Sequence, residues 1–237
     1  YRETAADLTA GATTSVKGIP RLANFPYGEV SWTKIQGRNE KHGMEAVISW
    51  EDIKTNNVHM IARTLLRVAR AVAKSIDTEI STAIVDEAGN TQAANATWDN
   101  ETVSSRTPFQ DILDAKAKIA VDNYDPDRNG YLLVNPVGYA HLLGNEAVRD
   151  KSQFYTDSAT RNGVVGMIAG LKVISSNSVT DGGAQVVIAK EALTWKSVVP
   201  LTVKTIDDPG IKTTIRAFEV GQVQVVNPDA ICKITGV

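Results

Sequence analysis

Cysteine and long apolar runs are both scarce in this sequence, and each scarcity excludes a class of protein. Cys232 is the only cysteine among 237 residues, which excludes a disulfide framework and a cysteine-rich zinc site. Its apolar strand context predicts a buried, inert thiol. The longest uninterrupted apolar run, from Val164 to Leu171, is far too short to cross a membrane. We therefore expect no membrane association and, because no basic-then-apolar leader opens the sequence, no signal peptide.

Charge of one sign is not in excess either. The sequence has 25 Lys and Arg against 27 Asp and Glu, a formal net charge of −2. This balance argues against a strongly basic nucleic-acid-binding protein but permits a local basic patch. Apolar residues make up 43% and charged residues 22%, as in a globular protein that buries a core. The length allows one large domain or two small ones, and the start at Tyr1 rather than Met predicts that an N-terminal segment has been removed.

Motifs of catalysis and metal binding are missing as well. The sequence has no G-x-S-x-G elbow and no Gly-Lys-Ser/Thr phosphate loop, and His42, His59 and His141 lack metal-ligand spacing. The segment Asp125–Gly130 begins like a calcium loop, but the position that requires a bidentate acid is Pro136, so we expect a tight turn. We predict no catalytic residue, no cofactor-binding residue and no metal site, and a protein that is not an enzyme.

The strongest positive signal is a long amphipathic helix. Apolar residues recur every three or four positions from Val58 to Ile80, which predicts one buried stripe. We expect the helix to be capped by Asn56 or Asn57 and to run to about Val85. The residues on the opposite side, named the basic face below, are Arg63, Arg67, Arg70 and Lys74. Such a face fits a solvated helix surface, a contact with the carboxylates of a neighbouring subunit, or a contact with a phosphate backbone.

Residues 21–50 combine turn residues with two strand-like runs. Glu29–Ile35 and Glu45–Ile48 flank the polar stretch Gln36–Gly43, a pattern that predicts a long hairpin. An isolated two-stranded ribbon is marginally stable in water, and this one has no helix of its own to cover it. We therefore expect it to pack across an adjacent subunit, with Trp32 as an anchor. The candidate inter-subunit residues are Phe25, Tyr27, Trp32, Lys34, Arg38 and Lys41.

The remainder of the sequence mixes helices and strands. Thr107–Gln110 combines an N-cap, a first-turn proline and a capping-box glutamine, which predicts a helix that ends near Asn123. A buried strand is expected at Tyr131–Val134, followed by a short helix that begins at Asn135. The C-terminal region is rich in strands, and its alternation breaks around Glu219–Gly221, where we expect a β-bulge. The fold class is therefore α+β.

Three short strings in the second half of the sequence occur in a characteristic order. They are Leu132–Pro136 (LLVNP), Gly166–Val173 (GMIAGLKV) and Val225–Ala230 (VVNPDA). They resemble, in this order, the strand with an Asn-Pro step, the Gly-x-x-x-Gly-x-x-Val strand entry and the closing strand of the major capsid protein family of tailed bacteriophages. The fold of that family is shared with encapsulin shells, and the resemblance extends over nearly the whole chain.

The resemblance implies the phage major capsid protein fold. Its parts would be an N-terminal arm at residues 1–20, an extended E-loop hairpin at 21–50, a peripheral domain with a long spine helix at 51–85 and 196–237, and an axial domain at 86–195. It also implies a structural protein that self-assembles as hexamers and pentamers into an icosahedral shell enclosing viral double-stranded DNA.

Partners and location follow from the same resemblance. The partners would be other copies of the chain, packaged DNA bound non-specifically, a scaffold or maturation protease, a portal and a decoration protein. The location would be the virion capsid, assembled in the host cytoplasm. Some family members join the E-loop to a neighbour by a Lys–Asn isopeptide bond, for which Lys34 and Lys41 are suitably placed. The segment Ile211–Ile215, where the acceptor is expected, contains no Asn, so we expect non-covalent locking.

Two alternatives remain open at this point. One is an encapsulin-like nanocompartment shell that encloses a cargo enzyme, which the contents of particles would distinguish from a DNA-filled shell. The other is a secreted β-rich glycan-binding module, suggested by the acceptor triplets that begin at Asn95 and Asn100. A monomer with affinity for oligosaccharides would favour that module.

Overall fold

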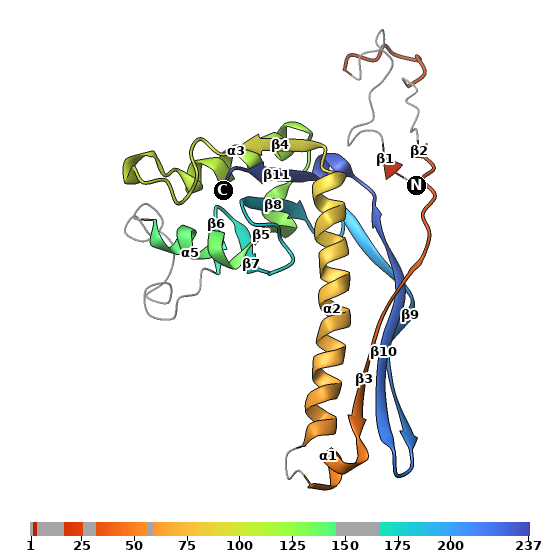
Figure 1. Cartoon of the computed structure of the whole chain (residues 1–237). Helices are drawn as coiled ribbons and strands as arrows, with labels where there is room; N and C mark the ends of the chain where they lie inside the picture. The colour runs from red at the N-terminus through yellow and green to blue at the C-terminus, as the bar shows by residue number, and fades with distance from the viewer. Residues whose placement is uncertain (1, 4–16, 26–31, 56–58, 146–165) are drawn as a thin grey trace.

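Two sheets of different shape and one long helix make up most of the molecule (Figure 1). The computed structural model describes residues 2–3, 17–25, 32–55, 59–145 and 166–237. The three-stranded sheet is long and narrow, the six-stranded sheet is compact, and helix α2 (Met60–Asp86) runs from one to the other. The α+β class expected from the sequence is confirmed.

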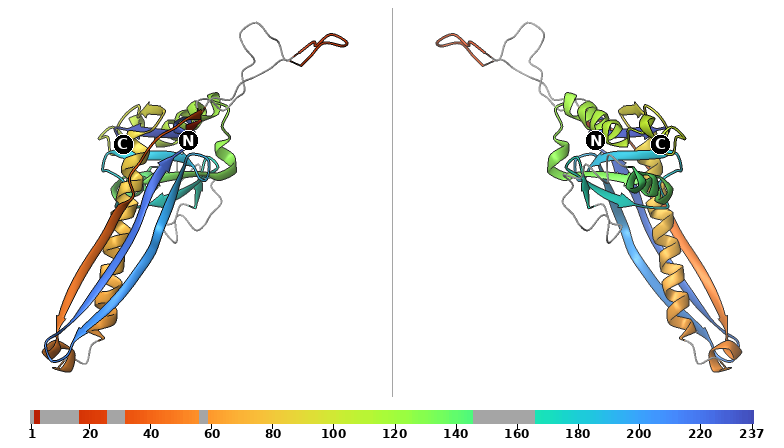
Figure 2. Two further views of the ribbon diagram at one scale, coloured as in Figure 1. Left: turned by 90° about the vertical axis from the view of Figure 1, so that its right-hand side faces the viewer. Right: turned by 90° about the vertical axis from the view of Figure 1, so that its left-hand side faces the viewer.

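The three-stranded sheet has the strand order β3-β10-β9, with antiparallel neighbours. Its strands are β3 (Glu40–Ser49), β9 (Leu193–Asp208) and β10 (Lys212–Val225). Helix α2 packs along β10 and β3, and the short helix α1 (Trp50–Thr55) lies at the far end (Figure 2). The β10–β9 register shifts between Phe218 and Gly221, which confirms the irregularity expected there.

Helix α2 has the buried stripe that its sequence period predicted. Val68, Val72 and Ile76 are buried and pack with Ala217 of β10, because residues four apart lie on one side of a helix. The helix ends at Asp86, one residue beyond the expected end. Its N-cap is His59, which makes no side-chain capping hydrogen bond, and the caps expected at residues 56 and 57 lie outside the described residues.

The six-stranded sheet has the order β4-β11-β8-β5-β7-β6, in which β4 and β11, and β5 and β7, are parallel. Its strands are β4 (Asn90–Ala93), β5 (Gly130–Val134), β6 (Met167–Ile168), β7 (Leu171–Ser175), β8 (Gly183–Ile188) and β11 (Ile231–Thr235). Trp98, Ile112 and Leu132 are fully buried in its core. Strand β11 belongs to this sheet, whereas β9 and β10 belong to the three-stranded sheet, so residues 196–237 contribute strands to both sheets.

Short helices surround this sheet, and their starts follow local capping chemistry. They are η1 (Val103–Ser105), α3 (Pro108–Val121), α4 (Pro126–Asn129), α5 (Pro136–Gly144) and η2 (Pro228–Ala230). The three α-helices each begin with a proline, whose missing N–H costs nothing in a first turn. Asn135 caps α5 by accepting a hydrogen bond from Val137 N at 2.9 Å. Thr107 makes no such bond at the start of α3, so the helix was predicted correctly but its side-chain cap was not.

The prediction that Glu29–Ile35 pairs with Glu45–Ile48 is wrong for the described residues 32–35, and residues 29–31 lie outside the described part of the chain. Strand β3 pairs along its whole length with β10 of the same chain, whereas β2 (Trp32–Thr33) pairs with β1 (Arg2–Glu3). The physical reason is that the edge of β10 provides backbone hydrogen-bond partners for β3. Helix α2 also covers the inner side of β3, where Ile48 is buried. The intrachain cover that the sequence did not reveal therefore exists for β3.

The β1–β2 ribbon also joins the range predicted as the N-terminal arm to the range predicted as the E-loop. Residues 17–25, named the projecting segment below, stand away from both sheets in every view (Figures 1 and 2). None of the described helices combines the length and apolarity needed to cross a membrane.

Candidate functional site

The projecting segment exposes apolar side chains. Leu22 is 107% exposed and Phe25 85% exposed relative to a free side chain, although both are large hydrophobic residues. A turn closed by Ala23 N donating to Pro20 O at 3.2 Å places Leu22 at φ 66°, a conformation for which glycine or asparagine is usual. A leucine in a fully exposed turn gains nothing within its own chain, so this segment has the properties of a contact surface.

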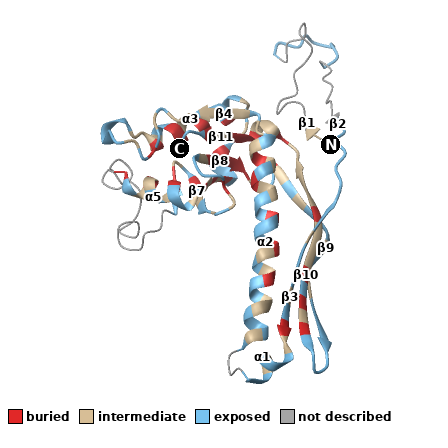
Figure 3. Cartoon of the chain, viewed as in Figure 1, coloured by how far each residue is buried: buried red, intermediate tan, exposed pale blue. Residues whose placement is uncertain are grey.

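Three of the other predicted inter-subunit residues lie in a different segment from Phe25. Lys34, Arg38 and Lys41 are exposed along the chain that leads from β2 into β3 (Figure 3). Lys41 already has a neighbour in its own chain, because its Nζ lies 5.1 Å from the centroid of the Phe218 ring. Tyr27 and the side chain of Trp32 lie outside the described residues, so their roles stay predictions.

The basic face of α2 is exposed, as its spacing predicted. Arg63, Arg67, Arg70 and Lys74 are all exposed, whereas the buried stripe faces β10. Within the described part of the chain none of the four forms an ion pair with a carboxylate. Four cations in three helical turns therefore present a positive strip that no ion pair among the described residues neutralises.

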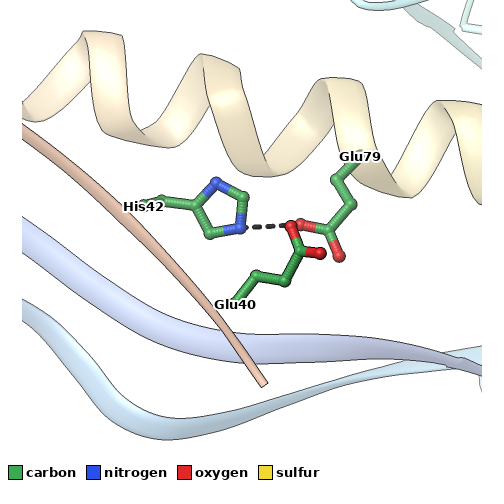
Figure 4. Close-up of side chains that lie close together, drawn as sticks. All are labelled: Glu40, His42 and Glu79. Atoms are coloured by element: carbon green, nitrogen blue, oxygen red, sulfur yellow. Dashed lines mark ion pairs between the residues drawn. The ribbon is translucent and has the colours of Figure 1, made fainter. Parts of the chain in front are cut away.

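A cluster of three ionisable side chains lies between β3 and α2 (Figure 4). Glu40 and His42 come from β3 and Glu79 comes from α2, and one potential ligand atom from each lies within 4.8 Å of the other two. His42 Nε2 is 2.6 Å from Glu79 Oε2, and His42 Nδ1 is 2.9 Å from Ser75 Oγ. No sequence pattern predicted this cluster, because its residues come from two elements and follow no motif spacing.

The two remaining sequence candidates have structural explanations. Cys232 is buried, as expected, and this burial raises the pKa of its thiol to about 11. Asp125–Gly130 forms the one-turn helix α4 rather than a plain turn. Asp125 caps it by accepting from Asp127 N at 3.0 Å, and Asp127 is paired with Lys116.

Comparison with known proteins gives consistent matches. Residues 34–234 match the sequence model of the phage capsid protein family, whereas no curated protein matches the chain. Among solved structures, one from Mycobacterium phage Che8 is 20% identical, with a TM-score of 0.67, and the alignment covers 82% of this chain and 70% of that chain. The capsid structure of cyanophage P-SCSP1u is 15% identical, with a TM-score of 0.66 and coverage of 91% and 81%.

An encapsulin structure is also similar. The holo-SrpI encapsulin complex from Synechococcus elongatus is 11% identical, with a TM-score of 0.58, and the alignment covers 89% of this chain and 78% of that chain. At these identities the structures show a common fold. That fold is the one which the order of sequence strings had indicated.

Proposed function

The chain belongs to the phage capsid protein family, and from this premise we propose how its surfaces build a shell. As a major capsid protein it is a structural protein that self-assembles into the icosahedral capsid of a tailed phage. The observation that carries the proposal is the projecting segment, in which the large apolar residues Leu22 and Phe25 are exposed.

The projecting segment would dock on an adjacent subunit. Burying a leucine or phenylalanine side chain contributes about 1.5–3 kcal/mol, and every copy in a shell would repeat the contact. A contact between two different surfaces of one chain closes into a ring when the rotation between copies permits, which fits hexamers and pentamers. We propose that the subunits are locked non-covalently, because Ile211–Ile215, where the acceptor of an isopeptide bond is expected, contains no asparagine.

The basic face would meet negative charge in the assembled particle. Packaged double-stranded DNA and the carboxylates of a neighbouring copy are both suitable, and they differ in their response to salt because phosphate contacts release counterions. We propose DNA bound non-specifically as the contents. A scaffold or maturation protease, a portal and a decoration protein remain proposed partners, with assembly in the host cytoplasm and no catalytic role for the chain itself.

An encapsulin-like compartment is the less favoured function. The family model that matches is that of phage capsids, although an encapsulin shares the fold. The family match also sets aside the glycan-binding module. Measuring nucleic acid and protein inside purified particles separates the two shells.

The test replaces the two exposed apolar residues together, Leu22→Ser with Phe25→Ser, in the full chain. We expect the yield of particles, measured by negative-stain imaging and sedimentation, to fall sharply. The circular dichroism spectrum of the subunit should stay unchanged. Val121→Ser is the matched control, because Val121 is 80% exposed on α3, away from the segment. Normal particles from the double variant, or an equal loss in the control, would contradict the proposal.

A further inference from the structure

We propose that Glu40, His42 and Glu79 form a binding site for a divalent cation such as Zn²⁺ that fastens β3 to α2. Two carboxylates and one imidazole carry a charge of about −2 when the imidazole is neutral, which a divalent ion balances. The three donor atoms already lie within 4.8 Å of one another (Figure 4). Glu40 and His42 are two apart on a strand, so both side chains leave β3 on the side that faces α2.

The imidazole is oriented for this role. Ser75 lies one helical turn before Glu79 on α2, and its Oγ is 2.9 Å from His42 Nδ1. When Nδ1–H donates to this hydroxyl, Nε2 carries the lone pair and points at the carboxylates. Histidines that ligate metals have the same arrangement, with the other ring nitrogen held by an acceptor that fixes the tautomer.

The contact between His42 and Glu79 is short but lacks a directed hydrogen bond. The His42 side chain is only 9% exposed, and Nε2 lies 2.6 Å from Glu79 Oε2. Neither atom has a properly directed hydrogen-bond partner among the described residues. Buried polar atoms are almost always satisfied, and two lone pairs at this distance repel each other unless a positive charge lies with both.

The cluster is bordered by Trp195 on one side and is open to solvent on the side of Glu40, where a cation would enter. The Trp195 ring meets the His42 ring edge-on at 6.0 Å, and Trp195 Nε1 donates to Glu219 Oε1 at 2.9 Å. Glu219, which lies opposite His42 on β10, is thereby engaged, and the half-buried indole lies beside the imidazole. Glu40 is exposed, so the open side of the cluster is accessible to solvent and to a cation.

A cation at this position would tie together the strand that leads from the projecting segment and the helix that supports it. The site is independent of the proposed function, because it is complete within one chain. Binding would stabilise the folded chain by mass action, since the unfolded chain does not hold the three ligands together.

The test is a titration of the metal-stripped full chain with ZnCl₂ by calorimetry, together with the absorption spectrum of bound Co²⁺. We expect one ion per chain, a rise in melting temperature with zinc, and a Co²⁺ spectrum of low coordination number. Removing an orienting partner alone weakens metal sites about 10–100-fold, so Glu79→Gln and Glu40→Gln should each weaken binding at least that much. Asp77→Asn, an exposed carboxylate of α2, is the matched control and should bind like the original chain.

Ser75→Ala keeps every ligand and provides a second measurement if a ligand variant fails to fold. We expect it to weaken zinc binding about tenfold with an unchanged stoichiometry. Zinc uptake that is equal in the original chain and in His42→Gln would overturn the proposal. So would a chain that takes up no zinc and is stabilised only by lowering the pH, because that result identifies a protonated His42–Glu79 pair.

Discussion

Strands β8 and β9 belong to the two sheets of one chain, yet their burial is opposite. In β8 every residue from Ala184 to Ile188 is buried, whereas β9 has no buried residue along its length (Figure 3). In the part of the chain that the structure describes, α3 packs against β4, β8 and β11 of the six-stranded sheet, and α2 packs against β3, β9 and β10 of the three-stranded sheet. The six-stranded sheet is therefore held by its own core, and the three-stranded sheet leaves surface for other copies to cover.

The largest effect is expected from removing matched side chains in the two cores. Ile112→Ala, at a site with no exposure in the six-stranded core, should lower the free energy of unfolding by about 2–5 kcal/mol. Ile76→Ala, between α2 and β10, should fall at the lower end of that range because the site is less enclosed. Denaturant unfolding of dilute subunits measures both changes, and equal losses would remove the contrast between the sheets.

A smaller effect is expected from the buried carboxylate of Asp111. It accepts from Trp98 Nε1 at 3.0 Å and from Asn95 N at 3.1 Å, and it fixes the loop that covers the core. Asp111→Ala should cost about 1.5–3 kcal/mol, since hydrogen bonds to charged groups are worth that much and their donors would be left unpaired. Asp114→Ala on the same helix is the control, and a similar loss there would mean that only helix propensity changed.

The basic face should contribute to assembly but hardly to folding. Arg67→Glu together with Arg70→Glu should change subunit stability by no more than about 0.5 kcal/mol, as exposed substitutions usually do. Particle yield or heat resistance should nevertheless decrease, because the reversed charges would repel the DNA or the carboxylates that the basic face is proposed to contact. Full particles of unchanged heat resistance would show that the strip is only solvated.

The smallest effect concerns Cys232 in β11. Its pKa of about 11 lies above the ordinary value of 9.0 because burial disfavours the thiolate. Iodoacetamide should therefore leave the folded chain almost unmodified at pH 8, which mass spectrometry detects. The raised pKa contributes stability that is fully present below pH 9 and is lost as the pH rises towards 11. Rapid alkylation without unfolding would show that water reaches this part of the sheet.

Sequence periodicity correctly predicted the elements that depend on interactions between residues close together in the sequence. The stripe of α2, the strand at Tyr131–Val134 and the helix capped by Asn135 were all correct, because each rests on contacts within a few residues. The pairing of β3 with β10 was not predicted, because β10 follows β3 by more than 160 residues. The sequence pattern of a strand does not specify which other strand it pairs with.

The same distinction between local and long-range interactions explains which functional residues the sequence predicted. The exposure of Phe25 and of the basic face followed from local pattern. The approach of Glu40 and His42 to Glu79 depends on where β3 docks on α2, which no local spacing encodes. Long-range register therefore limits what the sequence alone can predict about this site.

The length of α2 has a mechanical consequence. Val68 and Val72 fix one part of the helix to the three-stranded sheet, while Gln185 Nε2 donates to Ser81 Oγ at 2.9 Å and Lys233 Nζ donates to Val85 O at 3.2 Å at the other end. A helix of this length is a stiff rod of about 40 Å. A tilt of about five degrees where it meets the six-stranded sheet would displace its far end by about 3.5 Å, roughly one residue of a β-strand. The helix thus acts as a lever arm: a slight rotation at one end of the subunit produces, at the other end, a displacement of about one residue along a strand.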